Sequence, residues 1–457
     1  MKILILGAGQ VGRTAAQALS REEANEVTVV DLNEDILREL QDRYDVRTVS
    51  GNAAHPSVLE AAGAAEAEII FALTSSDEVN ITACQVAFTL YRTPTKIARI
   101  RAEAYTTRAD LFGSAGLSVD VFISPEQLVA EYVERLIHHP GTLQVLDFAD
   151  GKVRLVAVRT RRGGPLVGHR LRELPQHLPN MELRVVAIYR AGRAIVPDGD
   201  TAVEDGDEVF FLAAAEGIRR AMAQLRGGDD DPARRLIIAG GGHIGLRLAK
   251  TLEQSNQVKL IERDPRRARR ISELLDKAIV LQGDAADEEL LIEENIDAAD
   301  VFAAVTNSEE ANILSAMLAK RLGAHKVMAL INRPSYTELV ESSPIDIALS
   351  PQSITTGTLL AYVRRGDVVR VHQLRRGAAE ALEAVVHGDA RSSRVVGRAV
   401  AEIPLPDGVT LGAVVRGEQV IMAHHDTRVE ADDHVILFLA DRRHLEAVER
   451  LFVRATR

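Results

Sequence analysis

Two segments of the chain share one pattern: a short apolar run leads into closely spaced glycines and then into a helix-like stretch. The first is ILILGAGQVGRTAAQAL, with Gly7, Gly9 and Gly12, and the second is ARRLIIAGGGHIGLRLAKTL, with Gly240, Gly242 and Gly245. In such a turn the first glycine permits the bend, the second lets the backbone approach a pyrophosphate, and the third lets helix and strand pack closely. The pattern predicts two units that hold phosphate at a helix N-terminus.

The two halves of the chain resemble each other well beyond these glycines. VTVVDLNEDILREL matches VKLIERDPRRARRI, TVSGNAAHPSVL matches VLQGDAADEELL, and FALTSSDEVNITACQVA matches AAVTNSEEANILSAMLA. Matched positions stay 231 to 233 residues apart, as between Asp31 and Glu262 or between Gly7 and Gly240. A fixed separation of this kind indicates a tandem duplication.

Each half also changes character along its length. A Ser-Pro pair, at Ser124 and again at Ser350, is typical of a helix N-cap followed by the first helical residue, and short β-rich runs with Gly and Asp follow it. We therefore predict an α/β protein in which a Rossmann-like doubly wound parallel-sheet domain, followed by a small α+β domain, occurs twice. The predicted segments are Rossmann-like domains at 1–140 and 233–366, small domains at 141–226 and 367–457, and a linker at 227–232.

Composition excludes several classes of protein. The 55 Lys and Arg against 66 Asp and Glu give a net charge of −11, which argues against nucleic acid or anionic lipid as the main partner. No apolar run reaches the roughly 18 residues of a membrane-spanning helix, and the N-terminus shows no export signal. The single Cys84 cannot form an intramolecular disulfide, and its apolar helical setting predicts a buried structural thiol in a reducing cytoplasm.

Each half places an acidic residue where a dinucleotide-binding unit holds a ribose. Asp31 ends the strand VTVVD, nineteen residues after Gly12, and Glu262 ends VKLIE in the second half. A carboxylate there accepts hydrogen bonds from the adenine-side ribose, and the alternative for Asp31 is a helix cap before LNEDILREL. In the second half Arg263 is placed to reach a phosphate, which leaves ATP, ADP or a 2′-phosphorylated cofactor open. The other arginines are expected on a solvated helix face: Arg266, Arg267, Arg269 and Arg270.

Polar residues at two further strand ends are candidates for ligand contacts. Thr74-Ser75 and Thr306-Asn307 end a strand in each half, at the edge where doubly wound sheets collect ligands, and helix capping is the alternative. Basic and polar residues follow the next strand and could pair with phosphate in the first half only. They are Arg99 and Arg101 in the first half, against Asn332 and Arg333 in the second.

The sequence offers no group suited to catalysis. It contains no Walker A pattern, no HExxH motif and no CxxC pair, and we expect structural roles for the adjacent histidines 138–139 and 424–425. A dehydrogenase needs an acid or base beside its substrate, and the β-rich regions supply no strong candidate. The chain is therefore predicted not to be an enzyme, with a nicotinamide-dependent oxidoreductase as the alternative. A nucleotide-responsive scaffold unrelated to ions is a third interpretation.

The order of these motifs resembles the RCK, or KTN, domains that regulate potassium channels and transporters. The glycine loop, SGNA or QGDA, TSSDEVN or TNSEEAN, the Ser-Pro helix and VVGRAVAEIPLPDGVTLGAVVRGEQVI carry the resemblance over essentially all 457 residues. It implies NAD(H), with ATP or ADP, as regulatory ligands. It also implies a homo-oligomeric ring, peripheral on the cytoplasmic side of the inner membrane, that gates a membrane-embedded potassium transporter subunit.

The resemblance also implies which residues bind the nucleotide. In the first half they are Gly7, Ala8, Gly9, Gln10, Val11, Gly12, Asp31, Asn52, Thr74, Ser75 and Arg99. In the second half they are Gly240, Gly241, Gly242, His243, Ile244, Gly245, Glu262, Asp284 and Thr306. Asn52 departs from the commoner acidic residue that Asp284 represents. Ligands held by backbone amides and a ribose acid, without catalytic groups, suit a sensor whose binding energy shifts a conformational equilibrium.

Overall fold

The computed structural model describes most of the chain and divides it into two compact units. The units are Met1–Val129 with Ser350–Val363, and Ala130–Leu349 with Arg364–Arg457. The described residues are 1–22, 24–112, 116–164, 166–177, 182–218, 220–222, 233–341, 343–363, 367–374 and 379–452. The predicted linker at 227–232 and the predicted boundaries at 226 and 366 lie outside them.

The first unit is built on a six-stranded parallel sheet with the order β3-β2-β1-β4-β5-β6. This is the Rossmann order, which confirms the predicted fold of the first half. The strands are β1 Lys2–Leu6, β2 Glu26–Asp31, β3 Arg47–Ser50, β4 Ile69–Ala72, β5 Thr95–Arg99 and β6 Val121–Ile123. The helices are α1 Gln10–Leu19, α2 Glu34–Arg43, α3 Pro56–Ala61, α4 Asp77–Val86 and α5 Glu103–Thr106, with a π-helical turn at Ala87–Tyr91. Helix α6 Pro125–His138 begins in this unit and continues into the second.

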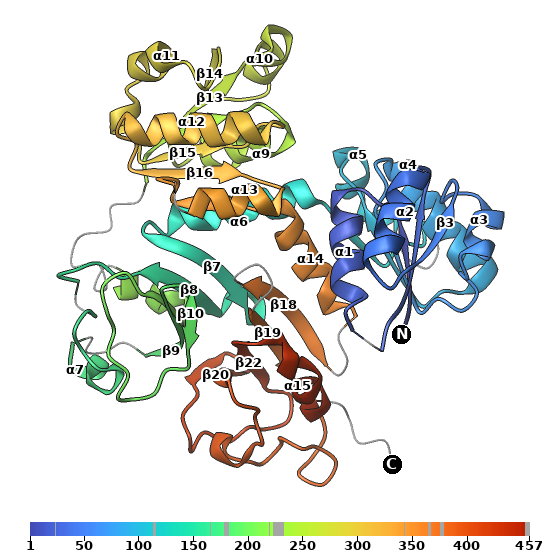
Figure 1. Cartoon of the computed structure of the whole chain (residues 1–457), viewed down its shortest axis with the longest axis vertical. Coiled ribbons are helices and arrows are strands. Elements are labelled where there is room, and N and C mark those ends of the chain that lie inside the picture. Colours follow the sequence, from blue (N-terminus) through green and yellow to red (C-terminus); the bar gives the residue numbers. More distant parts are fainter. Residues whose placement is uncertain are drawn as a thin grey trace. The chain divides into compact units, whose positions relative to one another are not determined.

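The second unit contains a parallel sheet of the same topology, β14-β13-β12-β15-β16-β17. Helix α12 covers one face of it, over β15 and β16 (Figure 1). The strands are β12 Arg235–Ala239, β13 Gln257–Glu262, β14 Ile279–Gln282, β15 Val301–Ala304, β16 Lys326–Leu330 and β17 Ile347–Leu349. The helices are α9 His243–Leu252, α10 Pro265–Ser272, α11 Glu288–Glu293, α12 Glu309–Arg321 and α13 Pro334–Glu341, and α14 Pro351–Ala361 follows β17 along the chain.

The second unit also holds two five-stranded antiparallel sheets, as the β-rich runs predict. Their orders, β10-β9-β11-β8-β7 and β18-β19-β22-β20-β21, are the same topology repeated. The first comprises β7 Thr142–Phe148, β8 Val153–Arg159, β9 Leu183–Arg190, β10 Arg193–Ile195 and β11 Glu208–Ala214, with α7 Leu174–His177. The second comprises β18 Val368–Leu374, β19 Ala379–Val385, β20 Val409–Arg416, β21 Gln419–Met422 and β22 His434–Leu439, with α15 Leu445–Phe452.

A buried acidic residue closes each antiparallel sheet. Asp207 accepts two hydrogen bonds from Arg190, each of 2.9 Å, and one of 2.8 Å from the Glu204 amide. Asp433 makes the same contacts with Arg416 and the Glu430 amide. Both aspartates are fully buried. In each half the aspartate therefore links the turn in which it lies to an arginine on a neighbouring strand through charge-assisted hydrogen bonds.

The helix that crosses over from the second half belongs to the first unit. Helix α14 packs against α1, which opens the first half (Figure 1). Its predicted cap is confirmed, because Ser350 accepts a hydrogen bond from the Ser353 amide at 3.3 Å and Pro351 is the first helical residue. The equivalent Ser124 accepts from the Gln127 amide at 3.3 Å at the start of α6.

The core of the first sheet includes the single cysteine. Cys84 lies on α4, is fully buried and packs in one cluster with residues of the sheet such as Leu6 and Ile70. Burial raises the pKa of its thiol to about 12, so the thiol stays neutral. The predicted structural role of Cys84 is confirmed. Within the described part of the chain, no helix combines the length and apolar character needed to cross a bilayer.

Candidate functional site

The first glycine loop has the geometry that its sequence predicts. Gly7 has a φ of +103°, and a Cβ there would lie 2.8 Å from the Thr74 amide nitrogen. A Cβ on Gly12 would lie 1.9 Å from the carbonyl oxygen of Gly7, so α1 packs directly on the turn. A Cβ on Gly9 would meet no atom within 4 Å beyond its chain neighbours and its own helix backbone, which leaves open space beside the N-terminus of α1. The three glycines therefore have separate roles: Gly7 forms the turn, Gly12 allows close packing of α1, and Gly9 leaves room for a ligand.

The second loop repeats this geometry. Gly240 has a φ of +109°, and a Cβ on Gly245 would lie 1.9 Å from the Gly240 carbonyl oxygen. A Cβ on Gly242 would meet no atom within 4 Å beyond its chain neighbours and its own helix backbone. Gly241 stands where the first half has Ala8, and a Cβ there would lie 2.9 Å from the Glu262 carboxylate. The first turn of each helix follows the loop, with Gln10 and Val11 in α1 and with His243 and Ile244 in α9.

The two acids predicted to hold a ribose contact the glycine loops themselves. Asp31 accepts hydrogen bonds from the Ala8 amide at 2.6 Å and from the Asn33 amide at 2.9 Å. The side chain that caps α2 is Asn33, which accepts from Asp35 and Ile36. The alternative interpretation of Asp31 as the helix cap is therefore wrong.

Glu262 repeats this arrangement in the second half. It accepts hydrogen bonds from the Gly241 amide at 3.0 Å and from the Asp264 amide at 2.8 Å. Asp264 in turn caps α10 by accepting from the Arg267 amide. Because each acid binds the residue between the first two glycines, its carboxylate lies beside the place predicted for a phosphate.

Asn52 and Asp284 have matching places at the end of the next strand. Asn52 accepts a hydrogen bond from the Ala54 amide at 2.9 Å, and Asp284 accepts one from Ala286 at 2.9 Å. Both side chains therefore shape the turn after β3 or β14. The sequence difference between them changes the charge of the edge while the local hydrogen bond is kept.

A buried asparagine joins the ends of two neighbouring strands in each half. Asn80 accepts from the amide and the hydroxyl of Thr74 at 2.9 and 2.7 Å, and donates to the carbonyl oxygens of Thr74 and Arg99. Asn312 makes the corresponding bonds to Thr306 and to the carbonyl of Leu330. Sequence reasoning did not single out these asparagines, although each ends a motif that matches between the halves, TSSDEVN and TNSEEAN.

The helices that follow these strand ends are capped by residues other than the predicted ones. Ser76 caps α4 and Ser308 caps α12, each accepting a hydrogen bond from the amide three residues later. Thr74 and Thr306 instead bind the asparagine, and Ser75 contributes its carbonyl oxygen to Arg101. Capping by Thr74-Ser75 or by Thr306-Asn307 is thus wrong, and the threonines lie against the first glycine of each loop.

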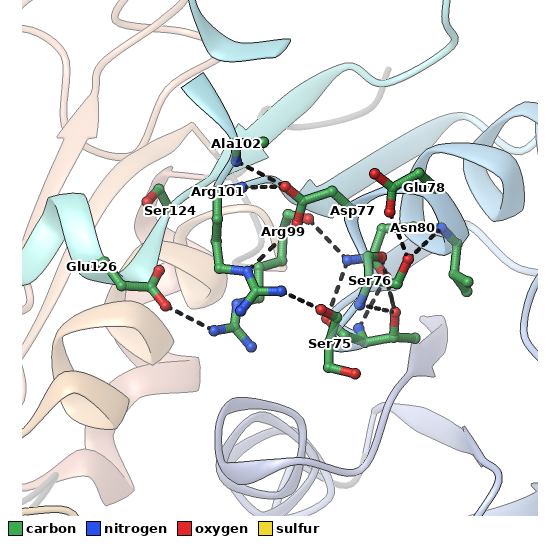
Figure 2. A network of polar contacts seen from close by, with 12 residues as sticks. Ser75, Ser76, Asp77, Glu78, Asn80, Arg99, Arg101, Ala102, Ser124 and Glu126 are labelled. Atoms are coloured by element: carbon green, nitrogen blue, oxygen red, sulfur yellow. Dashed lines mark hydrogen bonds and ion pairs between the residues drawn. The ribbon is translucent and has the colours of Figure 1, made fainter. Parts of the chain in front are cut away.

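Arg99, the last residue of β5, and Arg101, two residues later, have different partners (Figure 2). Arg101 donates to the Ser75 carbonyl and lies 3.5 Å from the carboxylate of Asp77. Arg99 pairs with Glu126, in the first turn of α6, at 2.9 Å. In the second half Leu330 occupies the position of Arg99, because its carbonyl accepts the equivalent asparagine bond. The predicted difference between the halves therefore lies at this strand end.

A cavity of about 380 Å³ is lined by five of the nine residues predicted to bind a nucleotide in the second half, and Gly241, His243, Ile244 and Gly245 are not among its lining residues. It combines the glycine loop, both acids and the β15 strand end, and it adds two arginines. Arg267 was expected on a solvated helix face, but it lines this cavity and lies 3.8 Å from Glu262. The lining residues are Gly240, Gly242, Ile261, Glu262, Arg263, Arg267, Gly283, Asp284, Ala285, Thr306, Asn307, Ser308 and Ala311.

Histidines and carboxylates do not assemble into a metal centre in the described residues. His139 is buried, and its Nε2 lies 3.0 Å from the Arg154 guanidinium. The pair His424-His425 lies exposed in a turn between β21 and β22. Each parallel sheet has backbone amides, a carboxylate fixed by hydrogen bonds and hydroxyl groups at its carboxyl edge. These groups suit the binding of a nucleotide.

Family models match both kinds of domain. The TrkA-N domain matches residues 3–125 and 236–351, and the TrkA-C domain matches residues 155–226 and 390–453. The crystal structure of the GsuK RCK domain has a TM-score of 0.61 and 19% identity, with 98% of this chain and 95% of that chain covered. The GsuK channel bound to NAD gives 0.60 and 19%, with 98% and 79% covered. At this identity the likeness to both structures establishes the RCK-type fold.

Sequence relatives are much closer. The Trk system potassium uptake protein TrkA of Halomonas elongata is 56% identical over 452 residues, which cover 99% of this chain and 98% of the relative. The TrkA of Vibrio alginolyticus is 55% identical over 453 residues, and that of Haemophilus influenzae is 46% identical over 453 residues, with the same shares covered. The chain therefore belongs to the TrkA family of Trk system potassium uptake proteins.

Proposed function

We propose that the chain is a regulatory subunit that gates a membrane potassium transporter in response to a bound nucleotide. The observation that carries this proposal is the repeated edge of two Rossmann-type sheets. There a carboxylate is fixed on the glycine loop, by Ala8 in one half and Gly241 in the other. Two equivalent sites without catalytic groups can bias a conformational equilibrium by binding energy alone.

The ligand class follows from the groups at these edges. Free amides at the N-termini of α1 and α9 suit a diphosphate, and Asp31 and Glu262 have acceptor capacity left for a ribose diol. NAD(H) has both groups, and the GsuK channel, a neighbour of the same fold, has been solved bound to NAD. ATP and ADP share the ribose and phosphates, so we propose them as further regulatory ligands.

The similarity to Trk system potassium uptake proteins supports a proposal for the partner and the place of action. We propose a membrane-embedded potassium transporter subunit of the TrkH or TrkG type as the partner, with this chain peripheral on the cytoplasmic face of the inner membrane. A homo-oligomeric ring built from paired Rossmann-type domains would carry the conformational change. The net charge of −11 disfavours direct binding to anionic lipid or nucleic acid.

The domain boundaries form part of this proposal. Rossmann-like domains at 1–140 and 233–366 would bind the nucleotides, and small α+β domains at 141–226 and 367–457 would complete each half. The segment 227–232 would be the linker between the halves. Expression of 1–226 and 233–457 as separate fragments, with binding measured on each, tests these limits.

Potassium flux into proteoliposomes that contain the membrane subunit tests the function. With the wild-type chain added, NADH or ATP should change the flux, and the membrane subunit alone should not respond. A response that persists without this chain would overturn the proposal. Oxidation of NADH with a panel of carbonyl substrates is the parallel test of the alternative, a nicotinamide-dependent oxidoreductase, and turnover there would favour it.

A further inference from the structure

A second cavity, of about 950 Å³, lies entirely within the second unit. Its walls are the end of α6 with the start of β7, the loop that follows β8, and the amino ends of β15, β16 and β17. The glycine loop of this unit lies at the opposite, carboxyl edge of the same sheet, and β15, with four residues, spans about 13 Å. The cavity is therefore separate from the predicted nucleotide site.

The two sides of this cavity are joined by a lysine. Lys326, the first residue of β16, donates from Nζ to the carbonyl oxygens of Leu136 in α6 and Thr142 in β7, each at 3.2 Å. These bonds fix the end of α6 and the start of β7 on the amino edge of the second parallel sheet. The cavity is thus a built part of the second unit.

The loop after β8 brings two arginines to the cavity. Arg161 and Arg162 line it, and both side chains are exposed. The loop is held by its backbone, because the amide of Gly164 donates to the Arg161 carbonyl at 2.8 Å and the amide of Thr160 donates to the Asp207 carbonyl at 2.8 Å. Within the described residues, neither guanidinium has an ion pair or a side-chain hydrogen bond.

Positive charge exceeds negative charge around the cavity. The carboxylates that line it already have partners inside the protein: one pairs with Lys320 at 2.7 Å, and the other accepts from two backbone amides at 2.7 and 2.9 Å. The donors of the two loop arginines therefore remain for an anion from solution. The charged lining residues are Arg159, Arg161, Arg162 and Lys326 against Asp300 and Asp346, and His325 also lines the cavity.

The second half lacks this excess of charge at the matching loop. The amide of Val386 donates to the Asp433 carbonyl as that of Thr160 donates to Asp207, so His387 matches Arg161 and Asp432 matches Gly206. His387 Nδ1 lies 3.2 Å from the Asp432 carboxylate. In the first half the histidine is replaced by a permanent cation and its acidic partner by a glycine. The loop of the first half is therefore suited to an anion that the second loop does not need.

We propose that this cavity binds an organic phosphate, with the phosphate group on Arg161 and Arg162 and the apolar body against Leu143, Val167 and Pro344. Guanidinium groups present N–H donors in a planar arrangement that matches phosphate oxygens. The three apolar side chains line the same cavity and are half-buried or exposed. A volume of about 950 Å³ is in the range of small-molecule sites and leaves room for more than an inorganic phosphate.

The test measures binding of phenyl phosphate, inorganic phosphate and phenol to the full-length chain by ligand-observed NMR titration. The chain carries Gly9→Asp and Gly242→Asp, whose carboxylates occupy the amides at which a phosphate would bind on the glycine loops. Phenyl phosphate should bind saturably and about 3- to 10-fold tighter than inorganic phosphate, because its ring covers apolar side chains. Phenol should not bind saturably. Equal affinities for the two phosphates, or no saturable binding of phenyl phosphate, would overturn the proposal.

Substitution of the arginines locates the site. Arg161→Gln together with Arg162→Gln should weaken binding of phenyl phosphate about 10-fold or more. The matched control is Arg193→Gln with Arg220→Gln, which removes the same charge from two exposed arginines, in β10 and after β11, that do not line the cavity. An equal loss in both pairs would mean that only net charge acts. That result, or no loss in either pair, would overturn the site.

Gly206 offers a variant that leaves both arginines in place. Gly206→Asp introduces the acid that the second half has at Asp432, and the backbone φ is positive at both positions, +84° and +65°. The new carboxylate should pair with Arg161 and weaken binding of phenyl phosphate about 3- to 5-fold. Gly206→Asn, similar in shape but uncharged, should not. Equal affinity in the two variants would contradict the role of Arg161. Because neither glycine loop takes part, failure of this site leaves the proposed function unaffected.

Discussion

The carboxylate of Asp31 accepts a hydrogen bond from the amide of Ala8 at 2.6 Å, so the residue predicted to bind ribose also holds the glycine loop in place. Glu262 has the same relation to Gly241 at 3.0 Å. Ala8 is fully buried, so removal of the carboxylate would leave its amide without this hydrogen bond. Substitutions of these acids should therefore affect the loop as well as the ligand.

Asp31→Ala should weaken nucleotide binding at the first site and lower stability. Loss of the ribose contact alone is worth about 1.5–3 kcal/mol, roughly 10- to 150-fold in affinity. The unpaired Ala8 amide should reduce the free energy of unfolding by about 1–3 kcal/mol. Calorimetric titration and thermal melts of the full chain measure the two effects. Asp31→Asn keeps an acceptor for Ala8 and should restore most of the stability but less of the affinity.

The glycines at the second and third positions of the loop should behave in opposite ways. Gly9 is the N-cap of α1 with extended backbone and open space around it, so Gly9→Asp fits and caps the helix. Its carboxylate would occupy the amides that a phosphate needs, and affinity at the first site should fall by about 100-fold or more without loss of stability. Gly12→Ala should instead destabilise the fold by about 3 kcal/mol or more, since its Cβ would lie 1.9 Å from the Gly7 carbonyl oxygen.

Melting curves beside titrations separate these two outcomes. Gly242→Asp and Gly245→Ala are the matched pair in the second half, with the same open space and the same 1.9 Å approach. Normal nucleotide affinity in both Gly9→Asp and Gly242→Asp would mean that the ligand does not lie on the glycine loops.

The buried ion pair between Asp207 and Arg190 should make the free energy of unfolding decrease at acid pH. Burial raises the pKa of the Asp207 carboxyl, but hydrogen bonds from Arg190 and the Glu204 amide more than offset this, so its pKa lies below its usual range. A pKa that is lower in the folded state gives stability that is present above the unfolded value of about 3.9 and is lost as pH falls through the folded value.

Asp207→Ala should therefore cost about 2–4 kcal/mol at neutral pH and reduce the loss of stability below about pH 4. Urea unfolding measured at pH 7 and at pH 3 tests this. Asp200→Ala is the control, because that carboxylate is 64% exposed and its ion pairs with Arg170 and Arg172 should contribute less than about 1 kcal/mol. If both variants lost the same free energy of unfolding, the buried ion pair of Asp207 would have no greater effect than the exposed ion pairs of Asp200.

The glycine loops and the duplication could be predicted because their requirements are local. A positive φ at Gly7 and a close approach at Gly12 follow from the turn itself, and strand order follows from the repeated motif. The roles of Asn80 and Glu126 were missed, since each depends on which strand or helix lies opposite, and spacing along the chain does not give that. For the same reason sequence alone could not decide whether Asp31 or Asn33 caps α2, because both precede the helix.

The arginines of the second site should give it a preference for the more highly charged nucleotide. Arg267 is the third residue of α10 and lies 3.8 Å from Glu262, and the matched residue of α2 is Ile36. In the Gly9→Asp background, Arg267→Ile should therefore lower affinity for ATP about 3- to 10-fold and affinity for NADH by less, because ATP carries more negative charge. The ATP loss should shrink as salt is raised. The reciprocal Ile36→Arg, with the second site blocked by Gly242→Asp, should strengthen ATP binding at the first site. Equal changes for ATP and NADH in both variants would mean that Arg267 only balances the charge of Glu262.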